Sequence, residues 1–95
     1  MDLGEFQQAI RLTYIDRDRT RGTDGTFRWL VEEVGELARS LRSKDPDGLV
    51  HELGDVIAWT ASVANLVGVD LQDAVARYAN GCPRCGAMPC RCPMR

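Results

Sequence analysis

Apolar residues recur at steps of three and four along most of the chain, which is the period of amphipathic helices. In the first such segment they fall at Leu3, Phe6, Ile10 and Tyr14, and this spacing predicts a helix from Leu3 to about Ile15. The sequence that follows, DRDRTRGTDGT, has charges, two glycines and no apolar side chain. It predicts an exposed connection, because glycine and clustered polar residues are typical of loops.

The next apolar stripe predicts the clearest helix of the chain, from Phe27 to Leu41. Its members are Phe27, Leu30, Val31, Val34, Leu37, Ala38 and Leu41. Thr26 is expected to cap the start of this helix, and the polar stretch RSKD is expected to end it.

A longer helix is predicted from Leu49 to Val67. Asp45 and Pro46 fit an N-cap and a first-turn proline, and Gly68 fits a C-cap. The apolar and small residues of this segment cover more than one face, which indicates burial on two sides.

A short fourth helix is predicted after Asp70, which with Asp73 resembles a capping arrangement, and is expected to end near Asn80. No segment shows the alternation of a strand. The pattern therefore predicts an all-α fold, a bundle of about four helices. We expect residues 1–80 to form this helical domain and residues 81–95 to form a separate, cysteine-rich tail.

Length and charge narrow the class of protein. A chain of 95 residues has difficulty burying its apolar surface alone, so we expect it to be completed by oligomerisation, as a homodimer or homotetramer. Its 12 Lys+Arg against 14 Asp+Glu give no basic field for a nucleic-acid polymer. The N-terminus shows no basic region followed by an apolar one, so no signal peptide is expected, and no apolar run approaches the roughly 18 residues that span a bilayer. A soluble, cytoplasmic protein without a membrane partner is expected.

Three glutamates, Glu32, Glu33 and Glu36, crowd within five positions of the helix predicted at 27–41. Like charges at this spacing repel one another, yet the helix predicted at 49–67 repeats the arrangement with Glu52 and Asp55. Two antiparallel helices joined by a short turn would bring both sets together. Isolated acidic pairs are usually solvated, but two sets that border a core favour Mg²⁺, which takes oxygen ligands and keeps waters for a phosphate-bearing substrate.

The motif EEVGE at 32–36 is followed, sixteen residues after its last glutamate, by ELGD at 52–55. Together they resemble the E-E-x-x-E and E-x-x-D motifs of the MazG-like, all-α nucleotide pyrophosphohydrolases, and the resemblance extends over about Phe27 to Ala79. It implies Mg²⁺-dependent (or Mn²⁺-dependent) hydrolysis of nucleoside triphosphates to a monophosphate and pyrophosphate.

By the same resemblance, Glu33, Glu36, Glu52 and Asp55 are expected to be the Mg²⁺ ligands, and Glu32 is expected to orient a water or accept its proton. Two other functions stay open. Phosphoribosyl-ATP pyrophosphohydrolase uses a related acidic-helix site, and a non-catalytic module would bind nucleotide and metal without turnover.

Several basic residues are candidates for phosphate contacts. Arg17 and Arg19, with Arg21, fit a bidentate phosphate clamp, or they alternate with aspartates to solvate a loop. Late in the chain, only Arg77 and Asn80 are available for this role.

The aromatic residues Trp29 and Trp59 would stack on a nucleobase. Alternatively they pack in the core, since both lie among apolar neighbours. His51 is interpreted as a surface residue at a helix start.

All four cysteines lie in the last fourteen residues, which is unlike the distribution of a disulfide framework. Cys82 and Cys85 form a C-P-x-C-G knuckle, and Cys90 and Cys92 form a C-x-C pair, so four thiolates would close a tetrahedral Zn²⁺ site. Free or redox-active thiols are the alternative. With no open position, such a zinc site would be structural and would hold the C-terminus in place.

Overall fold

Four α-helices and a short 3₁₀ helix make up the computed structural model, which describes all residues from Met1 to Arg95. In chain order they are α1 (Leu3–Arg21), α2 (Thr23–Ser43), α3 (Pro46–Val67), α4 (Leu71–Val75) and the 3₁₀ helix η1 (Ala76–Tyr78). No residue is in a β-strand. The expected all-α class is confirmed.

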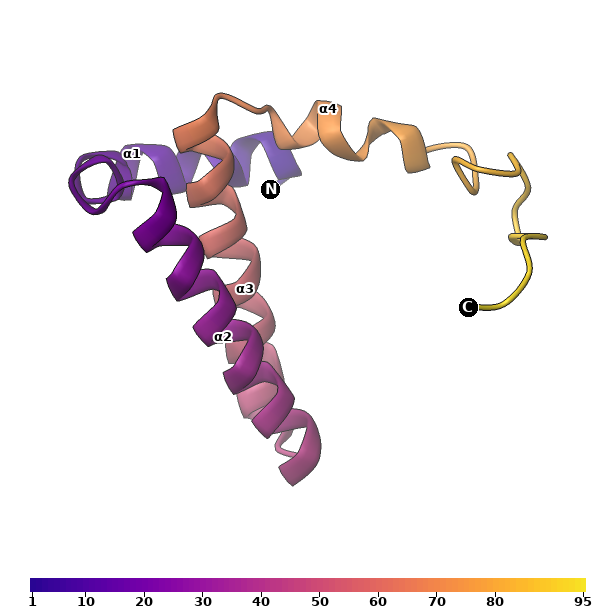
Figure 1. Ribbon diagram of the computed structural model, residues 1–95, viewed down its shortest axis with the longest axis horizontal. Helices are drawn as coiled ribbons and strands as arrows, with labels where there is room; N and C mark the ends of the chain where they lie inside the picture. Colours follow the sequence, from indigo (N-terminus) through magenta and orange to yellow (C-terminus); the bar gives the residue numbers. More distant parts are fainter.

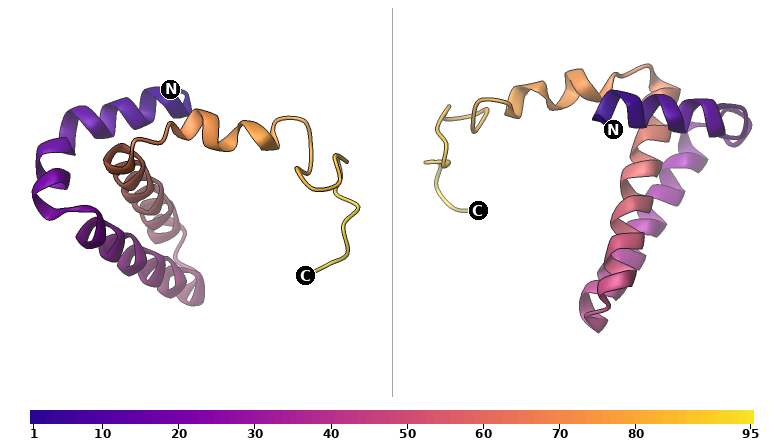
Figure 2. Two further views of the ribbon diagram at one scale, coloured as in Figure 1. Left: turned by 45° about the horizontal axis from the view of Figure 1, so that its top comes forward. Right: turned by 180° about the vertical axis from the view of Figure 1, so that it is seen from behind.

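The helices α2 and α3 lie side by side as a long antiparallel hairpin, and α1 lies across the end at which α2 begins and α3 ends (Figure 1). From there α4 leads away from the hairpin, and the C-terminal tail continues beyond it (Figure 2). Within one chain the helices therefore form an open arrangement, in which α3 contacts both α1 and α2.

The boundary between α1 and α2 differs from the prediction. The connection expected at residues 16–26 is helical except at Gly22, whose φ of 85° lies in the region that favours glycine. Within α1, Asp18 is buried and pairs with Arg21 across 2.9 Å, and Arg21 in turn lies over the ring of Trp59 on α3. Charges that resemble a solvated loop thus have internal partners. Thr26, expected to cap a helix from outside, is buried within α2.

A two-residue turn, Lys44 and Asp45, joins α2 to α3. Lys44 takes the left-handed conformation (φ 54°) that closes α2, and Asp45 and Pro46 occupy the expected positions at the start of α3. A Cβ at Gly48 would lie 2.6 Å from the Asp45 carboxylate and 2.9 Å from the Ser40 hydroxyl, so a larger residue there would displace these two side chains. Such a short turn makes α2 and α3 antiparallel neighbours.

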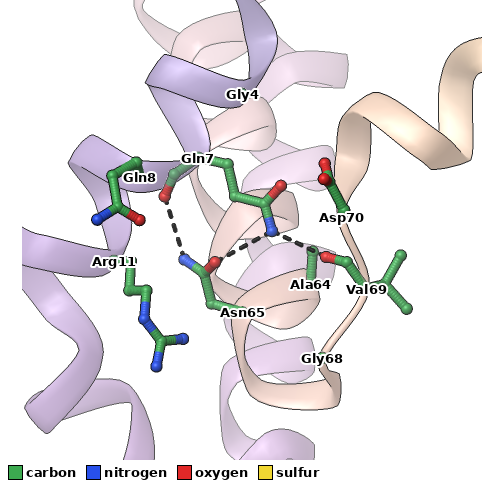
Figure 3. A pocket seen from close by; sticks show the side chains of 9 residues that line it. All are labelled: Gly4, Gln7, Gln8, Arg11, Ala64, Asn65, Gly68, Val69 and Asp70. Atoms are coloured by element: carbon green, nitrogen blue, oxygen red, sulfur yellow. Dashed lines mark hydrogen bonds between the residues drawn. The ribbon is translucent and has the colours of Figure 1, made fainter.

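Gln7 of α1 ties the end of α3 to the start of α4 (Figure 3). Its side-chain nitrogen donates to Asn65 Oδ1 over 3.1 Å and to the Val69 carbonyl over 2.8 Å. Its side-chain oxygen accepts from Leu71 N over 2.8 Å, and Asn65 donates back to the Gln7 carbonyl. These bonds line a pocket of about 310 Å³ and hold α1 across the end of the hairpin.

The end of α3 and the start of α4 lie where they were predicted, whereas the helical segment that follows ends earlier. Gly68, in the left-handed conformation (φ 73°), ends α3 as expected. Asp70 caps α4 by accepting from Gln72 N over 2.8 Å. The helical segment then ends at Tyr78, slightly before the predicted end near Asn80.

The chain buries little of itself. Six of its 95 residues are buried, among them Ile10, Ala61 and Ala64. Its accessible surface of 7225 Å² exceeds the roughly 5,500 Å² of a compact monomer of this mass. Its radius of gyration, 15.5 Å, likewise exceeds the about 12 Å of a compact chain of this length. None of the helices has the length and apolar character that a bilayer crossing requires.

An apolar stripe of α2 lies on the surface. Phe27, Val31, Val34 and Leu41 (the α2 stripe) are 49–59% exposed, whereas Glu33 is half-buried toward α3. The part of α3 up to Ile57 is also apolar and exposed, at Val50, Leu53 and Ile57. The predicted burial of α3 on two sides is therefore met within one chain only in the part after Ile57.

Candidate active site

Carboxylates from α2 and α3 converge on the hairpin. Side-chain oxygens of Glu33 and Glu36 on α2 and of Glu52 on α3 all lie within 4.8 Å of one another. Asp55 forms a second group with Glu52 and His51, again within 4.8 Å. The structure thus brings the four predicted Mg²⁺ ligands into one acidic cluster, because the short turn sets α2 and α3 face to face.

Glu33 is the carboxyl whose protonation the cluster changes most. Its pKa is raised to about 7, chiefly by burial, and hydrogen bonding with Glu36 and Glu52 and repulsion from Glu36 and Asp55 act in the same direction. Glu33 Oε2 and Glu52 Oε2 are both buried without a hydrogen-bond partner. Buried carboxylate oxygens of this kind are costly unless a proton or a cation satisfies them.

The residues of the acidic cluster fit a hard divalent cation. Mg²⁺ binds oxygen ligands at about 2.1 Å in an octahedron, which places the ligating oxygens roughly 3 to 4 Å apart. The oxygens of Glu33, Glu36 and Glu52, at separations of up to 4.8 Å, need only small side-chain movements to reach that range. A set of oxygen donors also favours Mg²⁺ or Mn²⁺ over softer metals.

His51 contacts the acidic cluster from the surface. Its Nε2 lies 3.1 Å from Asp55 Oδ2, while its side chain is 70% exposed. The sequence interpretation placed His51 at the surface but missed this contact. The signal that could have found it is the four-residue spacing, which puts both side chains on one helix face.

A pocket of about 290 Å³ opens beside Asp55, between α1 and α3. It is lined by Tyr14, Arg17, Asp18, Arg21, Asp55, Ala58, Trp59 and Ser62. Guanidinium groups suit a phosphate-bearing ligand, and aromatic rings suit a flat base. Tyr14 and Ser62 were missed as candidate substrate contacts, since only the crossing of α1 over α3 brings them here.

The three arginines of α1 have different surroundings. Arg17 lines the pocket. Arg21 is held 2.9 Å from Asp18, and its guanidinium lies 4.8 Å from the centroid of the Trp59 ring. Arg19 is exposed and lies outside the pocket. Arg17 and Arg21 thus both line the pocket, and Arg21 is also engaged with Asp18 and Trp59.

Trp29 and Trp59 stack on each other across the hairpin, with ring centroids 6.0 Å apart and planes inclined by 17°. Trp59 lines the pocket, and Trp29 is 51% exposed. The pair is therefore packed without being fully covered.

Glu32, Arg77 and Asn80, like Arg19, lie apart from both the acidic cluster and the pocket within one chain. Glu32 is exposed and belongs to neither group of carboxylates. Arg77 on η1 donates to the Tyr78 hydroxyl over 2.9 Å and lines a groove with the C-terminal tail. Asn80, just after η1, is exposed. Both follow α4, which leads away from the hairpin (Figure 1).

A helical hairpin that gathers carboxylates beside an arginine-lined pocket defines an all-α protein with an acidic site suited to a divalent cation. The MazG nucleotide pyrophosphohydrolase domain matches residues 21–84, a range that includes α2, α3 and the whole acidic cluster. The chain belongs to this family.

Two relatives are similar over much of the chain. The dATP/dGTP diphosphohydrolase of cyanophage S-2L is 39% identical over 73 residues, which cover 77% of this chain and 66% of the phage protein. The uncharacterized protein YvdC of Bacillus subtilis (strain 168) is 30% identical over 95 aligned positions, which cover 82% of this chain and 90% of YvdC. The chain thus spans about two thirds of the phage protein and most of YvdC.

Proposed function

We propose that this protein is a Mg²⁺-dependent (or Mn²⁺-dependent) pyrophosphohydrolase that converts a nucleoside triphosphate to a monophosphate and pyrophosphate. The observation that carries the proposal is the pair of buried oxygens, Glu33 Oε2 and Glu52 Oε2, that lack a partner in a cluster reaching the pocket through Asp55. Membership of the MazG family supports the same class of reaction. Because nucleotides are used in the cytoplasm, we place the protein there.

In this proposal Glu33, Glu36, Glu52 and Asp55 hold the cation. Bound Mg²⁺ would supply contacts to phosphate oxygens and lower the pKa of a water. Arg17 binds the phosphate chain from the α1 side of the pocket, where its planar guanidinium suits phosphate oxygens. Carboxylates on one wall and an arginine on the other fix the direction in which the triphosphate lies.

Other residues orient the reactants. Glu32, next to Glu33 in sequence and on the exposed side of α2, accepts the proton of the attacking water. The base stacks against the partly covered aromatic pair of Trp29 and Trp59. Arg19, Arg77 and Asn80 contact the phosphates only if another copy of the chain brings them to the pocket.

Purine deoxynucleoside triphosphates are the first substrates to examine. The phage relative is a dATP/dGTP diphosphohydrolase, and its similarity to this chain extends over 77% of the residues here. The pocket of about 290 Å³ has aromatic residues to receive a base.

We further propose that a second copy of the chain covers the α2 stripe. The accessible surface exceeds that of a compact monomer by roughly 1,700 Å², the difference between 7225 Å² and about 5,500 Å². Burial of that area on each of two chains falls in the range of obligate homodimers, which is about 2,000 to 5,000 Å² in total. A two-fold axis is the simplest arrangement, and two such dimers would give a tetramer.

The test is a product analysis with dATP and dGTP in ¹⁸O-labelled water, with and without Mg²⁺. We expect monophosphate and pyrophosphate in equal amounts, with the label in the monophosphate after attack at the α-phosphorus. A Glu36→Gln variant purified in parallel excludes a contaminating hydrolase. Formation of diphosphate and orthophosphate only, or no Mg²⁺-dependent product from a full panel of triphosphates, would show that the proposed function is wrong.

A further inference from the structure

The cysteines of the C-terminal tail converge, although no helix carries them. The Sγ atoms of Cys82, Cys85, Cys90 and Cys92 all lie within 4.8 Å of one another. The distance from Cys82 to Cys92 is 3.8 Å, and the distance from Cys85 to Cys90 is 3.9 Å. None of the four is in a disulfide.

These separations are those of a tetrahedral thiolate site. A Zn–S bond of about 2.3 Å places two ligand sulfurs roughly 3.8 Å apart, whereas the sulfurs of a disulfide lie about 2.05 Å apart. The two measured pairs, at 3.8 and 3.9 Å, share no atom and so correspond to opposite edges of one tetrahedron. The arrangement fits one metal ion at the centre better than two disulfides.

The backbone of the tail is folded so that the first two cysteines share a tight turn. Gly86 N donates to the Cys82 carbonyl over 2.7 Å, and Cys82 N donates to the Ala87 carbonyl over 3.0 Å. Gly81 has φ 113°, and a Cβ there would lie 2.9 Å from the Ala87 carbonyl oxygen. The glycines that flank this turn therefore allow the approach of the chain on which the sulfur geometry depends.

Two backbone amides point at sulfur atoms. Arg91 N lies 3.4 Å from Cys85 Sγ, and Cys92 N lies 3.3 Å from Cys90 Sγ. Amide donors stabilise the negative thiolate, which is the form that binds metal, and such outer contacts orient the ligands of a metal site.

Nothing else in the tail accounts for its ordered turns. Its side chains are mostly exposed, and it is far shorter than the roughly 40 residues below which small folds usually need a disulfide or a metal. No acidic residue follows Asp73, while Arg84 and Arg91 lie among the cysteines. Their charges offset that of a zinc ion with four thiolates.

We infer that Cys82, Cys85, Cys90 and Cys92 bind one Zn²⁺ ion. Four protein thiolates fill the tetrahedron and leave no position for water or substrate, so the site is structural. It fixes the conformation of residues 81–95 beyond η1. Because soft sulfur ligands and hard oxygen ligands select different metals, this site is independent of the acidic cluster and stands whether or not the chain hydrolyses nucleotides.

The first experiment is metal analysis of the full chain, purified under mild reductant and without a metal-affinity column. We expect about one zinc per chain, released by a thiol-modifying reagent. Cys85→Ser and Cys90→Ser should each lose most of the zinc, while His51→Gln, at the other group of metal-binding side chains, should retain it. Absence of zinc, iron in its place, or unchanged zinc in both serine variants would overturn the inference.

A second readout covers the case in which a serine variant folds poorly. Replacement of zinc by Co²⁺ in the wild-type chain should give the intense visible bands of a tetrahedral thiolate site. Removal of the metal should reduce the chemical-shift dispersion of the amide NMR signals of residues 81–95. The amide signals of α1, α2 and α3 should not shift. Weak octahedral Co²⁺ bands, or disulfides among the cysteines in freshly lysed cells, would contradict a zinc site.

Discussion

Arg21 lies 2.9 Å from Asp18, a carboxylate that is 1% exposed, where α1 meets α2. The same nitrogen, Nη1, also donates to Thr26 Oγ1 over 3.2 Å. One arginine therefore bonds buried groups from both helices, and its charge offsets the cost of burying Asp18, whose other oxygen, Oδ2, has no hydrogen-bond partner.

Removal of this arginine should destabilise the fold. Arg21→Ala is expected to lower the free energy of unfolding by about 3 kcal/mol, because it leaves Asp18 buried without its partner. Arg19→Ala, on an exposed turn of the same helix, should change the same quantity by less than about 0.5 kcal/mol. Denaturant unfolding followed by circular dichroism, at one protein concentration, measures both. If both variants lose the same small amount of unfolding free energy, the burial of Asp18 does not depend on its pairing with Arg21.

The acidic cluster can be tested through activity and metal binding together. Glu36→Gln and Asp55→Asn should each reduce Mg²⁺-dependent hydrolysis by at least about 100-fold, while helical content stays the same. Mg²⁺ titration by calorimetry should show the loss of affinity directly. His51→Gln should have a smaller effect, about 10-fold, because it acts on Asp55 from outside.

Asp47→Asn is the matched control for these variants. Asp47 is an exposed acid in the first turn of α3 and belongs to neither group of carboxylates. Its activity should equal that of the wild type. If Glu36→Gln and Asp55→Asn are as active as this control, the cluster is not the metal site.

Stability without metal should depend on the protonation of Glu33. Its pKa is raised from 4.5 to about 7 in the fold, so the native state keeps a proton that the unfolded chain releases. The stabilising contribution of the Glu33 proton to the free energy of unfolding is therefore fully present below pH 4.5. It is lost as the pH rises through about 7.

The comparison with Glu33→Gln isolates this contribution. In EDTA, the variant should have a higher melting temperature than the wild type at pH 8, and the difference should vanish near pH 4.5. Mg²⁺ at pH 8 should raise the melting temperature of the wild type more than that of the variant, because a ligand bound to the native state stabilises it. A variant less stable than the wild type at pH 8 in EDTA would show that the Glu33 carboxylate is not repelled by its neighbours.

Self-association should depend on the α2 stripe. The wild-type chain is expected to sediment as a dimer or tetramer at micromolar concentration, and Val31→Arg should shift it toward the monomer by placing a charge within the covered surface. Met94→Arg, in the exposed tail, is the control and should sediment as the wild type. A wild-type chain that is monodisperse and monomeric would contradict the proposed dimer.

The parts of the fold that could be predicted from the sequence are those with local markers. The start of α3 is marked by Asp45 and Pro46 and its end by Gly68, so the hairpin follows from residues near each boundary. The last turns of α1 are not marked in this way. Asp18 and Arg21 resemble loop residues until their contact is known, because periodicity measures apolar spacing and does not register buried ion pairs.

The acidic cluster could likewise be predicted from local sequence, whereas the residues that line the pocket could not. Glu33 and Glu52 could be expected to meet, because both border an apolar stripe on helices joined by a short turn. Tyr14 and Ser62 could not be assigned to the pocket, since their contact depends on how α1 crosses α3. The α2 stripe identifies a face that must be covered, but its spacing does not say whether the cover is the same chain or another.

Gly22 is the one residue between α1 and α2, and the conformation of this break affects the geometry of the site. Arg17 lies on α1 and Glu33 lies on α2, so the angle between these helices at Gly22 contributes to the distance between the arginine and the carboxylates. A Cβ built at Gly22 would have nothing within 4 Å, but the junction is held from both sides, because Arg21 donates to Thr26 Oγ1 across it over 3.2 Å. Insertion of one residue into the last turn of α1, after Arg17, would rotate the preceding part of the helix by about 100° about its axis and turn Arg17 away from the pocket. The number of residues between Arg17 and α2 is therefore constrained by the geometry of the site.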